Sequence, residues 1–501
     1  MPLSPHPRRL LAPVLGVAAL ALVASLGTLT PVAAEPVASN TDAALATKLR
    51  SVMQDSRVQR ATSSAVVLDA GDGAQLYSRW GARATTPASN AKILTAVAAM
   101  KNLGPAYRFR TEVIGRASVK QGVLGGRLYL KGYGDPTSRV SDYASLARQV
   151  RARGIRRVTG ALVADASFFD STRYNPNWST GYASSYYAAQ ISALTLAPNG
   201  DLDSGTLILR YRPGTLGRPA KVSVSPAAAA KYVTIGNRTT TAARGTSVTF
   251  SARRTAGSNT ITVTGRVPLG REAASRLVTV DRPELYATTI FRAELAKVGV
   301  RVDGPTRALA TPVTSRYRLA RDTSVPLSQL LVPFLKLSNN MHAEALTKTM
   351  GTLKGRPGNW RHGLGYTTAY ARSLGAPMAG VTLVDGSGLA RGNKLTGRAM
   401  AVLLVRVQRE KWFPAFHAAL PVAGNPSRMV GGTLRNRMVG TRAANNAHAK
   451  TGSLTGVTAL SGYVTGADGR RYVFAMLSQY TKASPRPVEN TLVQTLAGWR
   501  R

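Results

Sequence analysis

Two hydrophobic patterns alternate along the 501-residue chain. Toward both ends, apolar residues recur every three or four positions, a spacing that predicts amphipathic helices. Such segments cover residues 41–57, 93–101, 283–299, 325–351, 360–375 and 487–499. Gly104 and Pro105 end the second of these helices, because neither residue continues a helix well.

The middle of the chain has a different pattern. Residues 107–282 contain short runs of alternating apolar and polar residues separated by Gly, Pro, Asn and Ser, which is typical of an all-β module. Two further pairs of strand-like runs, 63–79 and 448–481, each flank an Asp-Gly dipeptide and favour β-hairpins.

Together these elements predict an α+β protein in which helices surround an antiparallel sheet and a β-rich insert interrupts the chain. The absence of alternating strand–helix–strand units argues against a doubly wound parallel sheet. The predicted boundaries place a first part of the main domain at 35–106, the inserted β-rich domain or domains at 107–282, and the second part at 283–501.

The first 34 residues have the features of a secretory signal peptide. Arg8 and Arg9 precede a long apolar stretch, and the small residues at 32–34 offer a cleavage site. The apolar stretch is slightly long, so an uncleaved membrane anchor is the alternative. We expect an exported protein that is extracellular or associated with the cell envelope.

The amino-acid composition excludes several kinds of site and bears on the choice of partner. The chain has no cysteine, which excludes disulfides, thiolate metal sites and a cysteine nucleophile. Its formal net charge is +43, and +41 remains once residues 1–34 are removed. For an exported protein this charge favours anionic cell-wall polymers as possible partners, with compositional drift as the alternative. Aromatic residues make up only 6%, and no basic patch contains interleaved aromatics, so nucleic-acid binding is not expected.

Candidate chemistry begins at the start of the helix that follows Pro87. Ser89 and Lys92 are three residues apart there and share one helical face, so the amine can reach the hydroxyl. A nearby amine with a lowered pKa can remove the proton from a serine hydroxyl. Burial and a second cation would both lower the pKa of Lys92.

Two further motifs strengthen this interpretation. Ser338 and Asn340 form a Ser-x-Asn motif between a buried-looking segment and a helix, and Lys450 begins the one Lys-Thr-Gly of the chain. The set Ser-x-x-Lys, Ser-x-Asn and Lys-Thr-Gly is that of β-lactamases and penicillin-binding proteins.

The sequence resembles the low-molecular-mass class C penicillin-binding proteins, which are exported serine D-Ala-D-Ala carboxypeptidases and endopeptidases. The first two motif serines are 249 residues apart, and Ser338 precedes Lys450 by 112 residues. The family has a large insert between its first two motifs, as this chain has. Further matching segments lie at 134–138, 384–391 and 431–438. The resemblance implies a penicillin-binding or β-lactamase-like transpeptidase domain interrupted by β-rich domains, with no cofactor.

The resemblance implies a role for each motif residue. Ser89 attacks the carbonyl of the penultimate D-Ala of a peptidoglycan stem peptide, and Lys92 is the general base. Ser338 relays a proton to the leaving amine, Asn340 holds the scaffold and the substrate amide, and Lys450 supplies a cationic field. β-Lactam antibiotics acylate the same serine and act as inhibitors.

The rest of the Lys-Thr-Gly segment is assigned to substrate binding. The hydroxyls of Thr451 and Ser453 hold the terminal carboxylate, with Gly452 between them. The backbone N–H groups of Ser89 and Ser453 form the oxyanion hole.

Other residues that could carry chemistry are weaker candidates. His342 lacks the further ligands that a metal site requires, and we expect it to be a packed or rim residue. His448 lies two residues before Lys450, so on a strand it could border the cleft, but we expect it to be passive. His362 and His417 have no evident partners. Asp165 in the insert could approach the catalytic lysine, as an acidic residue of that domain does in the resembling family.

Two alternative functions stay open on sequence grounds. A β-lactamase on the same scaffold needs a deacylating base, but Glu344 and Glu410 are the two Glu residues within 341–449 and neither has the expected loop context. A basic cell-wall-binding protein that has kept the fold is the other alternative.

Overall fold

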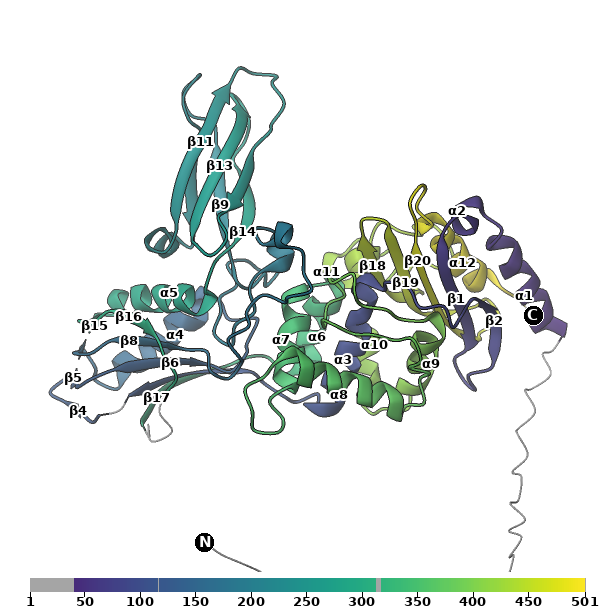
Figure 1. The fold of residues 1–501 in the computed structure, drawn as a ribbon, viewed down its shortest axis with the longest axis horizontal. Coiled ribbons are helices and arrows are strands. Elements are labelled where there is room, and N and C mark those ends of the chain that lie inside the picture. Colours follow the sequence, from purple (N-terminus) through teal and green to yellow (C-terminus); the bar gives the residue numbers. More distant parts are fainter. Residues whose placement is uncertain (1–39, 116, 312–316, 501) are drawn as a thin grey trace, which may run out of the picture. The chain divides into compact units, whose positions relative to one another are not determined.

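The computed structural model describes residues 40–115, 117–311 and 317–500. The expected signal peptide at 1–34 lies outside these residues. Within them, no helix combines the length and apolar character that crossing a bilayer requires. The α+β class is confirmed (Figure 1).

A five-stranded antiparallel sheet forms the centre of the main domain, in the order β18-β19-β20-β1-β2. Both predicted hairpins contribute to it, although a turn at residues 455–456 divides the first strand run of the second hairpin into two strands. Its strands are β1 (Thr62–Asp69), β2 (Gln75–Arg79), β18 (His448–Leu454), β19 (Val457–Thr465) and β20 (Arg471–Gln479). Pairing of β1 with β20, with Ala65 opposite Met476, joins the N-terminal hairpin to the C-terminal strands.

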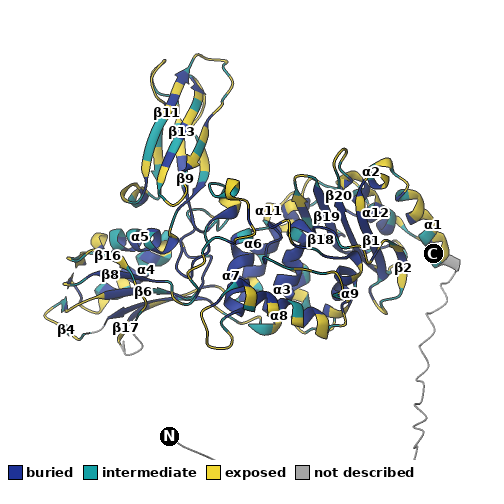
Figure 2. Ribbon diagram, viewed as in Figure 1, coloured by how far each residue is buried: buried dark blue, intermediate teal, exposed yellow. Residues whose placement is uncertain are grey.

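Helices cover both faces of this sheet, so its strands are buried on both sides (Figure 2). Along β20, Val473 and Ala475 pack on one side while Phe474 and Met476 pack on the other. The second side is covered by α1 (Asn40–Val52) and α12 (Arg486–Gly498).

The first side is covered by the larger helical layer. Its members are α3 (Ala91–Asn102), α6 (Leu327–Lys336), α7 (Asn340–Met350), α8 (Trp360–Ser373), α9 (Gly397–Val407) and α10 (Phe413–Ala419). Shorter helices are α2 (Ser56–Gln59), α11 (Arg428–Gly431) and the 3-10 turns η1 (Ala88–Asn90) and η5 (Gly432–Leu434).

The first part of the insert is a mixed sheet covered by two helices, α4 (Val140–Ala152) and α5 (Pro283–Lys297). The strand order is β16-β8-β6-β3-β17, with a smaller sheet β15-β7-β5-β4 beside it. The bounds are β3 (Arg110–Gly115), β4 (Val119–Lys120), β5 (Val123–Leu124), β6 (Leu128–Gly132), β7 (Arg157–Val158), β8 (Leu162–Asp165), β15 (Arg301–Val302), β16 (Thr306–Ala308) and β17 (Tyr317–Thr323).

Two expectations about the insert need correction. The block 107–282 is not all-β, because α4 lies within it. The boundary at 282 does not follow the strand pairing either: β15, β16 and β17 come after it in the sequence but pair with β7, β8 and β3. The chain therefore leaves the sheets of the insert after Thr323.

The second part of the insert, residues 206–279, is here called the β subdomain. One sheet has the order β10-β9-β14 and the other β11-β13-β12. The bounds are β9 (Thr206–Arg212), β10 (Lys221–Ser225), β11 (Thr234–Ala242), β12 (Ser251–Arg254), β13 (Thr260–Pro268) and β14 (Ala274–Thr279), with the turn η4 (Ala227–Lys231) between β10 and β11. Tyr211 of one sheet stacks on Phe250 beside the other, with ring centroids 3.7 Å apart.

Candidate active site

Ser89 lies in η1, the 3-10 turn that leads directly into α3. The preceding residue, Ala88, has φ = 46°, a left-handed conformation that costs a non-glycine residue on the order of 1–3 kcal/mol. This turn places the Ser89 hydroxyl over the first turn of α3, where Lys92 also points. The arrangement predicted from the Ser-x-x-Lys spacing is therefore present.

Lys92 is fully buried, and its amine contacts three oxygen atoms. The Nζ atom is 2.8 Å from Ser89 Oγ, 2.6 Å from Asn340 Oδ1 and 2.8 Å from the carbonyl oxygen of Ser387. Burial lowers the pKa of Lys92 to about 7, even though the negative charges of Asp385 and Glu344 oppose the shift. A substantial fraction of this amine is therefore neutral near pH 7 and can accept the Ser89 proton.

Ser338 and Lys450 form the second pair. Lys450 Nζ donates to Ser338 Oγ at 2.8 Å and to the Thr451 carbonyl at 2.9 Å. Burial, with the charge of Lys92 nearby, lowers the pKa of Lys450. Lys450 is therefore the second cation expected near Lys92. Besides burial, the charge of Lys92 lowers the pKa of Lys450, whereas burial lowers the pKa of Lys92. An incoming carboxylate would favour the protonated form of Lys450.

Ser338 occupies the break between α6 and α7, and its own φ is 58°. The helix α6 ends at Lys336 and α7 begins at Asn340, so Ser338 lies between them. Asn339 then caps α7, its side chain accepting from the N–H groups of Met341 and His342.

Asn340 is held at both ends of its amide. Its oxygen accepts from Lys92, and its Nδ2 donates to the backbone carbonyl of Tyr187 in the insert at 2.8 Å. The side chain therefore links the general base to a residue 153 positions earlier in the chain. The sequence offered no signal for the Tyr187 contact, because a backbone carbonyl carries no residue-specific signature.

The Lys-Thr-Gly segment lies on β18, an edge strand of the central sheet. The Thr451 hydroxyl contacts that of Thr433 at 2.8 Å, and Ser453 Oγ accepts from Arg486 at 2.9 Å. A Cβ at Gly452 would lie 2.6 Å from the Pro87 carbonyl oxygen, so only glycine lets β18 approach the turn that carries Ser89.

Two buried carboxylates that sequence reasoning did not assign hold the loop 384–391. Glu344 accepts from the N–H groups of Gly386 and Ser387, and Asp385 accepts from those of Gly388 and Ala390. This fixes the Ser387 carbonyl against Lys92. The loop had been singled out in the sequence, but its carboxylate partners had not.

The insert supports the same loop from the other side. Trp178 donates to Asp385 Oδ2 at 2.9 Å, and Asn175 donates to the Val384 carbonyl at 3.0 Å. Lys348 of α7, buried beneath Trp360, donates to Asp170 Oδ1 at 2.6 Å. The insert thus helps to build the active site.

One assignment from the resemblance is wrong. Asp165 does not approach Lys92: its carboxylate accepts from Lys131 at 2.8 Å and from the Thr311 N–H at 2.8 Å, inside the insert sheet. Its position at the end of β8 fixes it within that sheet, between β6 and the segment that follows β16.

The two Glu residues considered for a β-lactamase are both engaged elsewhere. Trp360 also donates to Glu344, at 2.7 Å, and burial with Asp385 nearby raises the pKa of that carboxyl. Glu410 accepts from Lys101 and Tyr370. Neither carboxylate contacts Ser89 or Lys92 in the structure.

Four histidines lie within the described residues, and none of them contacts Ser89 or Lys92. His342 is buried beside the Leu202 carbonyl, and burial lowers its pKa to about 4. His448 stacks on His417 with ring centroids 4.2 Å apart, and His362 contacts Asn359. Across residues 40–115, 117–311 and 317–500, no group of three His, Cys, Asp or Glu side chains is arranged to hold a metal ion.

The comparisons with known proteins agree with this geometry. A model of the D-Ala-D-Ala carboxypeptidase 3 (S13) family matches residues 45–498. The chain is 38% identical over 475 residues to the D-alanyl-D-alanine carboxypeptidase of Actinomadura sp. (strain R39), covering 94% of this chain and 88% of that protein. It is 26% identical over 396 residues to the D-alanyl-D-alanine carboxypeptidase DacB of Haemophilus influenzae, covering 77% and 79%.

The fold also has a solved counterpart. The crystal structure of penicillin binding protein 4 (dacB) from Haemophilus influenzae superimposes with a TM-score of 0.78 at 23% identity, covering 90% of this chain and 99% of that one. The resemblance to the low-molecular-mass class C penicillin-binding proteins is confirmed. The chain belongs to the D-Ala-D-Ala carboxypeptidase 3 (S13) family of serine peptidases.

Proposed function

We propose that the protein is exported and removes the terminal D-Ala from peptidoglycan stem peptides through an acyl-enzyme on Ser89, and that β-lactams acylate the same residue. The observation that carries the proposal is the buried Lys92 amine, with its lowered pKa, 2.8 Å from Ser89 Oγ. The named activity of the relatives supports the choice of substrate.

The acylation step follows from these contacts. Neutral Lys92 takes the hydroxyl proton as Ser89 Oγ bonds to the carbonyl carbon of the penultimate D-Ala. The N–H groups of Ser89 and Ser453 receive the developing oxyanion, and each such donor is worth about 3–4 kcal/mol in measured cases. Ser338, held by Lys450, relays the proton from Lys92 to the leaving amine as the C–N bond breaks, which returns Lys92 to its neutral form. Water then hydrolyses the ester and frees Ser89.

The substrate also fits the edge position of β18. An extended peptide can add to an exposed sheet edge through main-chain hydrogen bonds. Thr451 and Ser453 lie on that strand, where their hydroxyls can bind the terminal carboxylate beside the Lys450 charge. If the cleft also admits cross-linked peptides, the same chemistry gives endopeptidase activity.

The test uses synthetic stem peptides that end in D-Ala-D-Ala and purified cross-linked dimers. We expect the wild-type protein to release one D-Ala per stem peptide, and a folded Ser89→Ala variant to release none. Conversion of dimers to monomers would add endopeptidase activity. Absence of D-Ala release by folded wild type, or equal release by the variant, would contradict the proposal.

The pH dependence of acylation follows from the Lys92 pKa. The reactive form of the amine is neutral, so the acylation rate constant should rise with pH through about 7 and level off above it. Stopped-flow measurement with a fluorescent penicillin from about pH 5 to 9 checks this dependence. A rate that is flat or falls across pH 7 would mean that Lys92 is not the base.

A further inference from the structure

The β subdomain carries an unusual charge distribution. Residues 206–279 contain twelve Arg and Lys but one acidic residue, Glu272. Eleven of the twelve are exposed, and none of these eleven forms an ion pair within the described residues, which include the whole subdomain. The exception is Arg254, whose side chain is buried.

Strand register gathers three of these cations on the outer face of the sheet β11-β13-β12. Arg238 pairs with Thr264, which also pairs with Ser251, so Arg238 and Arg253 share a face. Arg266 lies two residues beyond Thr264 on the same face. Strand spacing places the Cα atoms of Arg238 about 8 Å from Arg266 and about 12 Å from Arg253.

The other sheet repeats the arrangement on its own outer face. Lys221 is directly opposite Arg212, and Arg210 follows on the same face, flanked by Ser223 and Ser275. Like charges directly opposite each other destabilise a sheet. The buried residues of both sheets share one core, so the two cationic faces point away from each other.

We infer that the β subdomain binds a flexible linear polyanion with a phosphate on each repeat, the chemistry of polyol-phosphate wall polymers. Guanidinium groups bind phosphate bidentately, and the Thr and Ser hydroxyls between the cations can donate further hydrogen bonds. This inference rests on the proposed export to the cell envelope.

Two observations favour such a polymer over other anionic partners. A planar lipid surface meets one face at a time and usually receives apolar side chains, yet the one large exposed hydrophobic residue of the subdomain is Leu216. Single-stranded nucleic acid requires aromatic stacking platforms, but the strand residues of the two outer faces are mainly Arg, Lys, Thr and Ser around Ile208 and Leu277. The exposed Tyr186 and Tyr187 adjoin Ile208 and Leu277 but lie outside the subdomain.

The test measures binding of the full mature protein to poly(glycerol phosphate) at several salt concentrations. One triple variant is Arg238→Gln/Arg253→Gln/Arg266→Gln, and the other is Arg210→Gln/Arg212→Gln/Lys221→Gln. The matched control, Lys354→Gln/Arg356→Gln/Arg361→Gln, removes the same charge from an exposed part of the catalytic domain.

We expect each face variant to weaken binding roughly tenfold or more and to reduce the salt slope by about 2, and the control to change affinity less than about twofold. Equal loss in face and control variants, or no binding by wild type in about 0.1 M salt, would overturn the inference. Equal affinity for single-stranded DNA of the same charge, or stronger binding to anionic vesicles, would overturn the assignment of the partner. The penicillin acylation rate, measured on the same variants, tests the proposed function separately from polymer binding.

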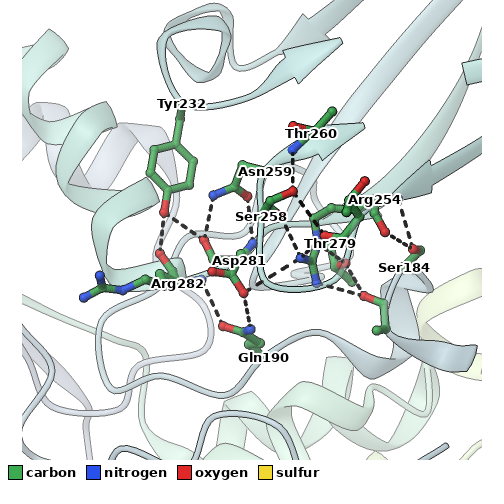
Figure 3. Close-up of polar contacts among 12 residues, drawn as sticks. Ser184, Gln190, Tyr232, Arg254, Ser258, Asn259, Thr260, Thr279, Asp281 and Arg282 are labelled. Carbon is green, nitrogen blue, oxygen red and sulfur yellow. Dashed lines mark hydrogen bonds and ion pairs between the residues drawn. The ribbon is translucent and has the colours of Figure 1, made fainter. Parts of the chain in front are cut away.

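A second inference concerns Arg254, the buried side chain among the twelve Arg and Lys residues of the β subdomain. Its guanidinium donates to the carbonyls of Ala183, Thr255 and Ser258 and to Thr279 Oγ1, as Figure 3 shows for this cluster. The backbone N–H of Arg254 donates to Ser184 Oγ, which donates in turn to the Arg254 carbonyl.

The same network holds the other end of the segment 183–190. Gln190 donates to Asp281 Oδ1 at 2.7 Å and accepts from the Arg282 N–H at 2.9 Å (Figure 3). Between these anchors lies the 3-10 turn η3 (Tyr186–Ala188), whose Tyr187 carbonyl accepts from Asn340. We propose that Arg254 is a positioning residue, which fixes the Tyr187 carbonyl and through it the amide of Asn340.

Arg271 supplies the control, because it lies in the same subdomain but its side chain is exposed, whereas that of Arg254 is buried. We expect Arg254→Ala to lower the acylation rate constant roughly tenfold per folded molecule, with Arg254→Lys recovering part of the loss and Arg271→Ala leaving the rate constant unchanged. In an Asn340→Ala background, Arg254→Ala should have no further effect on this rate constant. A lower unfolding temperature with an unchanged rate constant, or additive losses in the double variant, would reduce Arg254 to a purely structural role.

Discussion

Replacing Lys92 with methionine is expected to slow acylation of Ser89 by roughly 10²–10⁴-fold, the range in which a positioned general base contributes. Methionine keeps most of the side-chain volume in a fully buried position but offers no group to accept the Ser89 proton. The substitution also leaves Asn340 Oδ1 and the Ser387 carbonyl without their shared donor. Acylation kinetics with a fluorescent penicillin measure the effect.

Lys101 provides the matched control because it lies on the same helix, α3, but is exposed and pairs with Glu410. Lys101→Met should change the free energy of unfolding by less than about 1 kcal/mol, as exposed ion pairs do, and should leave acylation unchanged. Near wild-type acylation by a folded Lys92→Met variant would mean that another group removes the Ser89 proton.

Gly388→Ala is expected to have the second-largest effect. Gly388 has φ = 81°, and a Cβ there would lie 1.8 Å from the carbonyl oxygen of Ala88, the residue before the nucleophile. Because neither backbone can yield without moving Ser89 or the Ser387 carbonyl, we expect acylation to fall roughly 100-fold or more. We also expect a loss of unfolding free energy, which chemical denaturation measures.

Gly375→Ala is the control that separates backbone strain at a positive φ from displacement of Ser89. Gly375 has a comparable φ of 77°, but nothing lies within 4 Å of the Cβ that alanine would add. Gly375→Ala should therefore lose about 1 kcal/mol of stability from backbone strain and keep its acylation rate. If both variants behaved alike, the close contact between Gly388 and Ala88 would have no role in positioning Ser89.

The residues that could be predicted from the sequence are those that belong to short motifs and act through their side chains. Ser89 and Lys92 are one helical turn apart, so local spacing alone brought them together, and Ser338 and Lys450 were placed through the resemblance. The contacts made by Tyr187 and Ser387 could not be predicted, because both act through backbone carbonyls that any residue supplies.

Part of the fold was predictable from periodicity and part was not. Two hairpins with Asp-Gly turns account for four of the five strands of the central sheet, but the turn at residues 455–456 that separates β18 from β19 was not predicted. The helix α4 was also missed, although Tyr143, Leu146 and Val150 follow helical spacing. The late strands β15 and β16 have two and three residues, too few to show a period. Their return to the insert sheet is a long-range pairing that local patterns do not encode.

The most direct test of the account is intact-mass analysis of the mature protein and a Ser89→Ala variant after incubation with a penicillin. The account predicts one covalent adduct on the wild type and none on the variant. An adduct on both proteins, or no adduct with the antibiotic left intact, would contradict Ser89 as the acylated nucleophile; no adduct with the antibiotic hydrolysed would indicate a β-lactamase instead.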